Sequence, residues 1–165
     1  MRVSARLGRA IAAGVLSLTA VVGFAGCQFQ TLQQYPPANG VSATSNGVMV
    51  RNLVIVATAP GEGVLVGAVV VDNKETLSGV TGIAHLSNGD DGAALQFTMA
   101  APLQLTKNTA TNLSEHGIAV SSPDLRAGLT ATVELTFRDA GTITVTLPVM
   151  DAASPEYSNL ERPTS

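Results

Sequence analysis

Side chains that could bind a soft metal ion are few in this sequence of 165 residues. Imidazole and thioether groups are the donors that soft transition metals favour. Met49 lies within a strand-like pattern and Met150 ends another, so both are expected to fill irregular gaps in a core, as methionine often does. The donors that remain for a binding role are His85, Met99 and His116.

The residues of an enzyme active site form no familiar pattern here. The sequence lacks a Gly-x-Ser-x-Gly motif, which is the nucleophile elbow of many hydrolases. The sequence alone leaves paired catalytic carboxylates open, but Asp90-Asp91 lies in the glycine-rich stretch 88–92, where solvated turn residues are expected. That stretch also lacks the spaced ligands and distal Glu of a calcium loop. We therefore expect a protein that is not an enzyme.

The single cysteine, Cys27, follows a segment typical of exported proteins. Three arginines precede an apolar stretch over residues 10–24, which is too short to cross a bilayer as a helix and is typical of a secretory signal peptide. The stretch Phe24-Ala25-Gly26-Cys27 resembles the bacterial lipobox, whose cysteine carries diacylglycerol and becomes the new N-terminus after cleavage. We predict a lipoprotein signal peptide in residues 1–26 and lipid attachment at Cys27. An ordinary signal peptide that contains a cysteine is the alternative.

Charge limits the partners of the exported chain. Removal of residues 1–26 would leave all 12 acidic residues and six of the nine basic ones. Nucleic acids and anionic lipid surfaces both require concentrated Lys and Arg, so neither is an expected partner. Membrane attachment is therefore expected to come from acyl chains, on the extracytoplasmic face of the cell membrane. Seven arginines against two lysines indicate a GC-rich genome, and from this bias we infer an actinobacterial source.

Composition divides the exported chain into a tether, one domain and a tail. Residues 27–47 comprise the lipidated cysteine and a stretch rich in Gln, Ser, Thr, Asn, Gly and Pro, which is expected to form a flexible tether. Residues 152–165 carry prolines and scattered charges and are expected to be a disordered tail. Residues 48–151 are enough for one domain with a modest core.

Alternation of apolar and polar residues predicts the fold class. It runs through residues 129–138 and resumes through 143–149, on either side of Asp139-Ala140-Gly141. Period two around a glycine-containing turn predicts a β-hairpin with one buried face. The runs 48–58 and 63–73 are more continuously apolar, as expected of central strands. With about seven short strands in all, the sequence predicts an all-β fold: an antiparallel β-sandwich of immunoglobulin-like or cupredoxin-like type.

The segment "LRAGLTATVELTFRDAGTITVTLPVM" resembles the C-terminal part of PCuAC-type copper chaperone domains, and the resemblance extends more weakly back to about residue 48. The shared pattern consists of an Ala-Gly turn, an alternating strand, a glycine hairpin and a closing Leu-Pro-Val strand. The chain is similar to the actinobacterial lipoprotein relatives of that family, the LpqE-like group. The resemblance implies the β-sandwich fold and introduces Cu(I) as a ligand.

The resemblance also implies a degenerate copper motif. The family binds Cu(I) through a His-Met pair, then a Met after ten intervening residues, and then a His-x-Met after twenty-one further intervening residues. His85 matches the first histidine, but Leu86 replaces the paired methionine; Met99 follows after 13 intervening residues, His116 after 16 more, and Ile118 replaces the last methionine. The implied site is a three-coordinate one with fewer soft donors than the family has, and hence weaker for Cu(I). Alternatively, both histidines are merely solvated and the methionine packs in the core.

Two functions remain open. The first is a lipid-anchored, non-catalytic binding module of the cell envelope that binds an unidentified envelope protein, with the loop around residues 87–94 as the surface considered first. The second is an extracytoplasmic chaperone that delivers Cu(I) to a cuproprotein. A close grouping of His85, Met99 and His116 would favour the chaperone, and scattered positions would favour the binding module.

Overall fold

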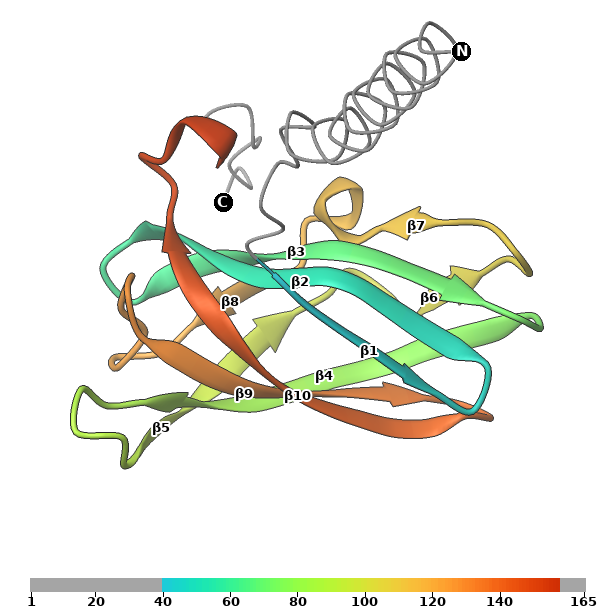
Figure 1. Cartoon of the computed structure of the whole chain (residues 1–165), viewed down its shortest axis with the longest axis horizontal. Helices are drawn as coiled ribbons and strands as arrows, with labels where there is room; N and C mark the ends of the chain where they lie inside the picture. The colour runs from blue at the N-terminus through green and yellow to red at the C-terminus, as the bar shows by residue number, and fades with distance from the viewer. Residues whose placement is uncertain (1–39, 158–165) are drawn as a thin grey trace, which may run out of the picture. The chain divides into compact units, whose positions relative to one another are not determined.

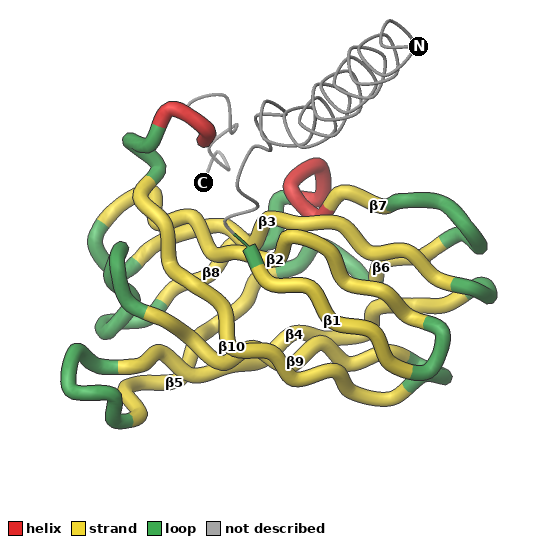
Figure 2. Tube along the Cα trace, in the orientation of Figure 1, coloured by secondary structure: helices red, strands yellow, loops and turns green. Residues whose placement is uncertain are grey.

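Ten strands and two short 3-10 helices make up residues 40–157, the part of the chain that the computed structural model describes (Figures 1 and 2). The all-β prediction is confirmed. The predicted signal peptide, the predicted lipid attachment at Cys27 and residues 28–39 and 158–165 lie outside this range. Among the described residues, no helix has the length and apolar character needed to cross a membrane.

The predicted hairpin over residues 129–149 corresponds to the last two strands. In chain order the elements are β1 (Val41–Ser45), β2 (Val48–Ala59), β3 (Glu62–Val71), β4 (Glu75–His85), β5 (Asp91–Thr98), β6 (Leu103–Leu105), β7 (Thr111–Asn112), η1 (Leu113–His116), β8 (Ala119–Ser121), β9 (Thr130–Phe137), β10 (Gly141–Asp151) and η2 (Pro155–Tyr157).

The strands form a sandwich in which two strands belong to both layers. One layer contains β1, β2, β3, β7 and β8, and the other contains β4, β6 and β9. β10 pairs with β9 over residues 141–148 and then runs parallel to β2 over Val149–Asp151. β5 pairs first with β4 and then, over Gln96–Thr98, with β8. The antiparallel sandwich is thus confirmed, with β2–β10 as its parallel pair among the described strands.

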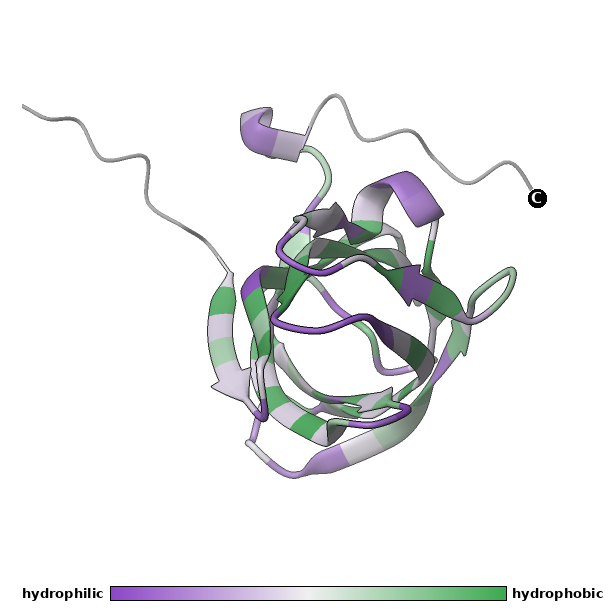
Figure 3. Ribbon diagram, turned by 90° about the vertical axis from the view of Figure 1, so that its right-hand side faces the viewer, coloured by the Kyte–Doolittle hydropathy of each residue, from purple (hydrophilic) through white to green (hydrophobic). Residues whose placement is uncertain are grey.

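Side chains on the inner faces of the two layers form the main core. Every second residue is buried from Ala131 to Phe137 in β9 and from Ile143 to Val149 in β10, and the residues between them are more exposed. Figure 3 shows this alternation as bands of apolar and polar colour along the strands. Each large apolar side chain buried in this way contributes about 1.5–3 kcal/mol to folding, and the strict period two keeps every one on the inner face.

The centre of β2 is buried on both faces. Leu53 and Ile55 join the main core, whereas Val54 and Val56 pack in a second, outer group. Tyr157 from η2 packs against this outer group and is 9% exposed. The continuous apolar run that the sequence shows in β2 therefore has a physical reason, because the C-terminal segment covers its outer side.

The folded domain extends beyond the predicted bounds of 48–151 at both ends. Residues 41–45, which we assigned to the tether, form β1 and pair with β2 across the Asn46-Gly47 turn, where both residues have positive φ as in a type I′ hairpin. Residues 152–157, which we assigned to the tail, carry η2. The sequence did not predict β1 because its side chains are small and resemble those of a linker. It did not predict the burial of Tyr157 because the residues that cover this side chain belong to strands far away in the sequence.

Replacing Tyr157 by alanine should lower the free energy of unfolding by about 2–3 kcal/mol, because the apolar area buried against Val54 and Val56 is lost. Urea denaturation followed by circular dichroism measures this change. Tyr157→Phe keeps the ring and should stay within about 0.5 kcal/mol of the parent. Equal stability of the alanine variant and the parent would show that the C-terminal segment does not hold the outer group.

Candidate functional site

His85 ends β4 and lies between threonines of β9. Its Nδ1 is 2.9 Å from Thr130 Oγ1, and its Nε2 is 3.1 Å from Thr132 Oγ1. The same Nε2 is 3.8 Å from Asp91 Oδ1 on β5, and the side chain is 20% exposed. Both ring nitrogens therefore have polar partners, and a metal ion at His85 would have to displace a threonine hydroxyl.

Asp91, the first residue of β5, pairs with His85. Met99 comes directly after Thr98, the last residue of the same strand. The eight residues of β5 rise ~3.3 Å each, which separates Met99 from His85 by roughly 25 Å along the strand. The methionine is half-buried and packs against the main core. His85 and Met99 therefore lie at opposite ends of β5.

His116 ends η1 and is exposed. The ladder between β5 and β8 ends at the pair Thr98–Ala119, so Met99 lies one residue beyond that pair and His116 three. Met99 and His116 thus flank the same end of the β5–β8 ladder, whereas His85 pairs with the first residue of β5. Within residues 40–157, no group of three or more His, Cys, Asp and Glu side chains is arranged to hold a metal ion.

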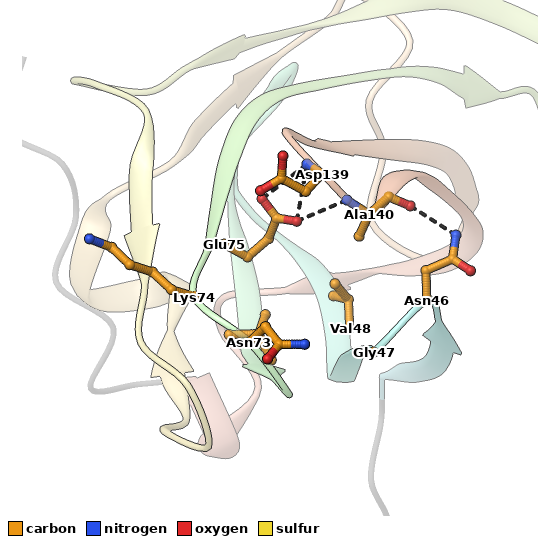
Figure 4. Close-up of a pocket in the computed structure, with 9 residues that line it drawn as sticks. Asn46, Gly47, Val48, Asn73, Lys74, Glu75, Asp139 and Ala140 are labelled. Atoms are coloured by element: carbon orange, nitrogen blue, oxygen red, sulfur yellow. Dashed lines mark hydrogen bonds between the residues drawn. The ribbon is translucent and has the colours of Figure 1, made fainter.

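Glu75, the first residue of β4, has a buried carboxylate that the sequence analysis did not single out. Its oxygens accept hydrogen bonds from the backbone N–H groups of Thr76 (2.6 Å), Asp139 (3.1 and 3.2 Å) and Ala140 (2.8 Å). Figure 4 shows this carboxylate turned toward the β9–β10 turn, in a pocket of about 190 Å³. Because the backbone groups occupy both oxygens, the carboxylate holds the turn in place. Nothing in its sequence surroundings, a polar turn beside a lysine, marks it as buried.

Burial and hydrogen bonding act on Glu75 in opposite directions. Burial disfavours the charged carboxylate and alone would raise its pKa. The backbone hydrogen bonds stabilise the charged form and outweigh burial, so the pKa of Glu75 lies below its ordinary value of 4.5. The carboxylate is therefore ionised at neutral pH, which is the state that binds the turn most strongly.

Asp124 holds the segment between β8 and β9 against β5. Its Oδ2 accepts a hydrogen bond of 2.8 Å from the backbone N–H of Ala93, and Ser122 Oγ donates one of 3.4 Å to the carbonyl oxygen of Ala93. A Cβ at Gly92 would lie 3.0 Å from Asp124 Oδ2, so a larger residue there would require this carboxylate to shift by a few tenths of an ångström. These contacts occupy the backbone edge of β5 where it leaves β4.

Comparisons with known proteins identify the fold. No family model and no curated protein matches the sequence. Among solved structures, the copper-bound PCuAC domain from PmoF2 aligns with a TM-score of 0.50 at 19% identity and covers 67% of this chain and 98% of that one. The apo PCuAC domain from PmoF1 gives 0.52 at 14% identity, covering 67% of this chain and 99% of that one. The apo PmoF2 domain gives 0.51 at 19%, covering 69% and 98%. The chain has a PCuAC-type fold, as the sequence resemblance implied.

Glu75→Gln should lower the free energy of unfolding at neutral pH by about 1–3 kcal/mol, because a neutral amide replaces a charged acceptor of several backbone N–H groups. The pKa of Glu75 is depressed in the folded state, so its stabilisation is present above the ordinary pKa of 4.5 and is lost as the pH falls through the folded-state pKa. The parent should therefore lose more stability in acid than the variant.

Urea denaturation at a series of pH values from neutral to acid measures both effects. Asp72→Asn, which changes an exposed carboxylate in the neighbouring turn, is the matched control and should retain the parent's stability. A parent and a Glu75→Gln variant that lose stability in parallel as the pH falls would contradict the role given to this carboxylate.

Proposed function

We propose that this chain is a non-catalytic binding module that holds Cu(I) on the extracytoplasmic side of the cell membrane. The observation that carries the proposal is the likeness of its fold to a copper-bound PCuAC domain. Cu(I) favours thioether and imidazole donors, and the domain offers both close in sequence to the pair where β5 ends and β8 begins.

Met99 and His116 are the ligands that we propose for the ion. Met99 comes one residue after Thr98, the last paired residue of β5. His116 comes three residues before Ala119, the residue of β8 that pairs with Thr98. The half-buried thioether supplies a soft donor next to the core, and the exposed imidazole supplies a donor that an incoming ion can reach. A site with two donors should bind more weakly than the motif with additional methionines, which suits a protein that passes its ion on.

Anchoring is part of the same proposal. The apolar leader and the motif that ends at Cys27 support export and attachment of acyl chains to that cysteine. A domain held at the membrane surface in this way would deliver Cu(I) to an envelope protein within reach of its tether. The acidic character of the exported chain supports a protein partner and argues against nucleic acid.

A module that binds an envelope protein without copper is the second candidate. The observation that favours it is that His85 pairs with the first residue of β5 whereas Met99 follows its last, which separates one histidine from the rest of the motif that the resemblance implies. In this case the PCuAC-type fold would serve as a rigid support for its loops.

A competition titration for Cu(I) against a chromophoric chelator, with residues 28–165, tests the copper site. We expect one ion per chain, and Met99→Leu and His116→Ala should each weaken binding by roughly tenfold or more, because each removes one of two donors. His85→Ala should leave the affinity unchanged. Met49→Leu is the matched control for the loss of a thioether outside the site and should also have no effect.

Absence of competition would end the copper proposal and leave the second candidate. Equal losses in His85→Ala and His116→Ala would instead show that the loops converge on a three-donor site in the presence of the ion.

A further inference from the structure

The β2–β3 turn, the β4–β5 turn and the β8–β9 segment lie at the end of the domain drawn on the left of Figure 1, and three grooves lie among them within residues 40–157. The first, of about 490 Å³, lies between the β4–β5 turn and the β8–β9 segment. The second, of about 540 Å³, lies between the β2–β3 turn and β5, and the third, of about 420 Å³, between the β2–β3 turn and residues 125–127. Residues 122–127 border all three grooves. We call this continuous surface, formed by residues 57–62, 86–94, 122–129 and Asp151, the loop end.

Charge is unevenly distributed between the two ends of the domain. At the opposite end, around Glu75, three acidic residues (Asp72, Glu75 and Asp139) face three basic ones (Lys74, Lys107 and Arg138). The loop end has a single basic side chain, Arg126, and is the negative pole of the domain. Its five carboxylates belong to Glu62, Asp90, Asp91, Asp124 and Asp151.

Two of these carboxylates, those of Glu62 and Asp91, accept no hydrogen bond from another described residue. Glu62 is exposed, and its side chain makes no hydrogen bond or ion pair within residues 40–157. The side chain of Asp91 is 74% exposed, and its one charged neighbour within residues 40–157 is His85, at 3.8 Å. These carboxylates are therefore available to charges from outside the domain.

The loop end also carries one exposed apolar side chain. Leu86 is 37% exposed, the one large apolar side chain with such exposure among the described residues, and it lines the first groove. An exposed apolar side chain within a polar rim is the usual composition of a protein–protein contact.

Addition of a strand is not the way in which a partner would bind beside β5. The N–H and the carbonyl oxygen of Ala93 already bond to Asp124 and Ser122, so the edge of β5 at the loop end is occupied. A partner must therefore bind through side chains that enter the grooves.

From these observations we propose that the loop end docks a partner protein through a segment in which apolar side chains alternate with lysine or arginine. Leu86 contacts the apolar side chains, and the carboxylates of Glu62 and Asp91 attract the basic ones and favour their encounter with this end. The proposal does not depend on Cu(I), because neither Met99 nor His116 belongs to the loop end.

A synthetic peptide in which leucine alternates with lysine, labelled with a fluorophore and one photo-reactive leucine, is the probe. The full chain is held in phosphatidylcholine nanodiscs, and empty nanodiscs serve as the blank. Fluorescence anisotropy should show binding that weakens at high salt, and light-induced cross-links should fall within residues 57–62, 86–94 and 122–129. A peptide with glutamate in place of lysine should not bind.

Variants separate the loop end from a general effect of acidic charge. Leu86→Ser and the double variant Glu62→Gln/Asp91→Asn should each weaken binding of the lysine peptide by roughly three- to tenfold. Asp72→Asn/Asp139→Asn removes the same two charges from the opposite end and should leave the affinity unchanged.

Four results would overturn the proposal. They are no binding of the lysine peptide, cross-links outside the loop end, equal weakening by the Asp72→Asn/Asp139→Asn control, and a dimer of the parent chain that Leu86→Ser dissociates. The last result would identify a second copy of this chain as the occupant.

Discussion

The passage of β5 and β10 from one layer to the other is the constraint on which the rest of the fold depends. Each strand exchanges one set of backbone hydrogen bonds for another partway along, so the two layers are joined at both corners without an unpaired edge there. The path of β5 also decides where the candidate ligands lie, because one end of the strand pairs with His85 and the other leads into Met99. β5 therefore places these two candidate donors at its opposite ends.

Carboxylates serve two different purposes in this domain. Glu75 is buried, and its carboxylate oxygens accept hydrogen bonds from backbone N–H groups. Its charge therefore stabilises the conformation of the β9–β10 turn. Glu62 and Asp91 begin β3 and β5, and both side chains are exposed. The same functional group thus fixes the backbone at Glu75 and at Asp124 and remains exposed at Glu62 and Asp91. Burial and the supply of N–H donors, rather than residue type, distinguish the two roles.

The sequence predicted those features that depend on local pattern. The β9–β10 hairpin follows from period two and a glycine turn, and both are local. β1 escaped prediction because its five residues are small and polar enough to resemble a linker. Tyr157 and Glu75 escaped because their burial depends on residues far away in the chain. The same reason applies to His85, whose position at a strand end was predictable but whose partners, Thr130 and Thr132, lie more than forty residues later.

The geometry of β1 determines how the domain would respond to tension on its N-terminal side. β1 pairs with β2 from Ser45–Val48, next to the turn, to Val41–Leu53 at the open end, and the chain toward the N-terminus leaves from that open end. A force applied at residue 40 would therefore break the pairs one after another, starting at Val41, rather than all at once. β2 would remain in place, since β3 pairs with it along most of its length. Separation of β1 from β2 would lengthen the extended segment that precedes the domain, while the core between the remaining strands stays closed.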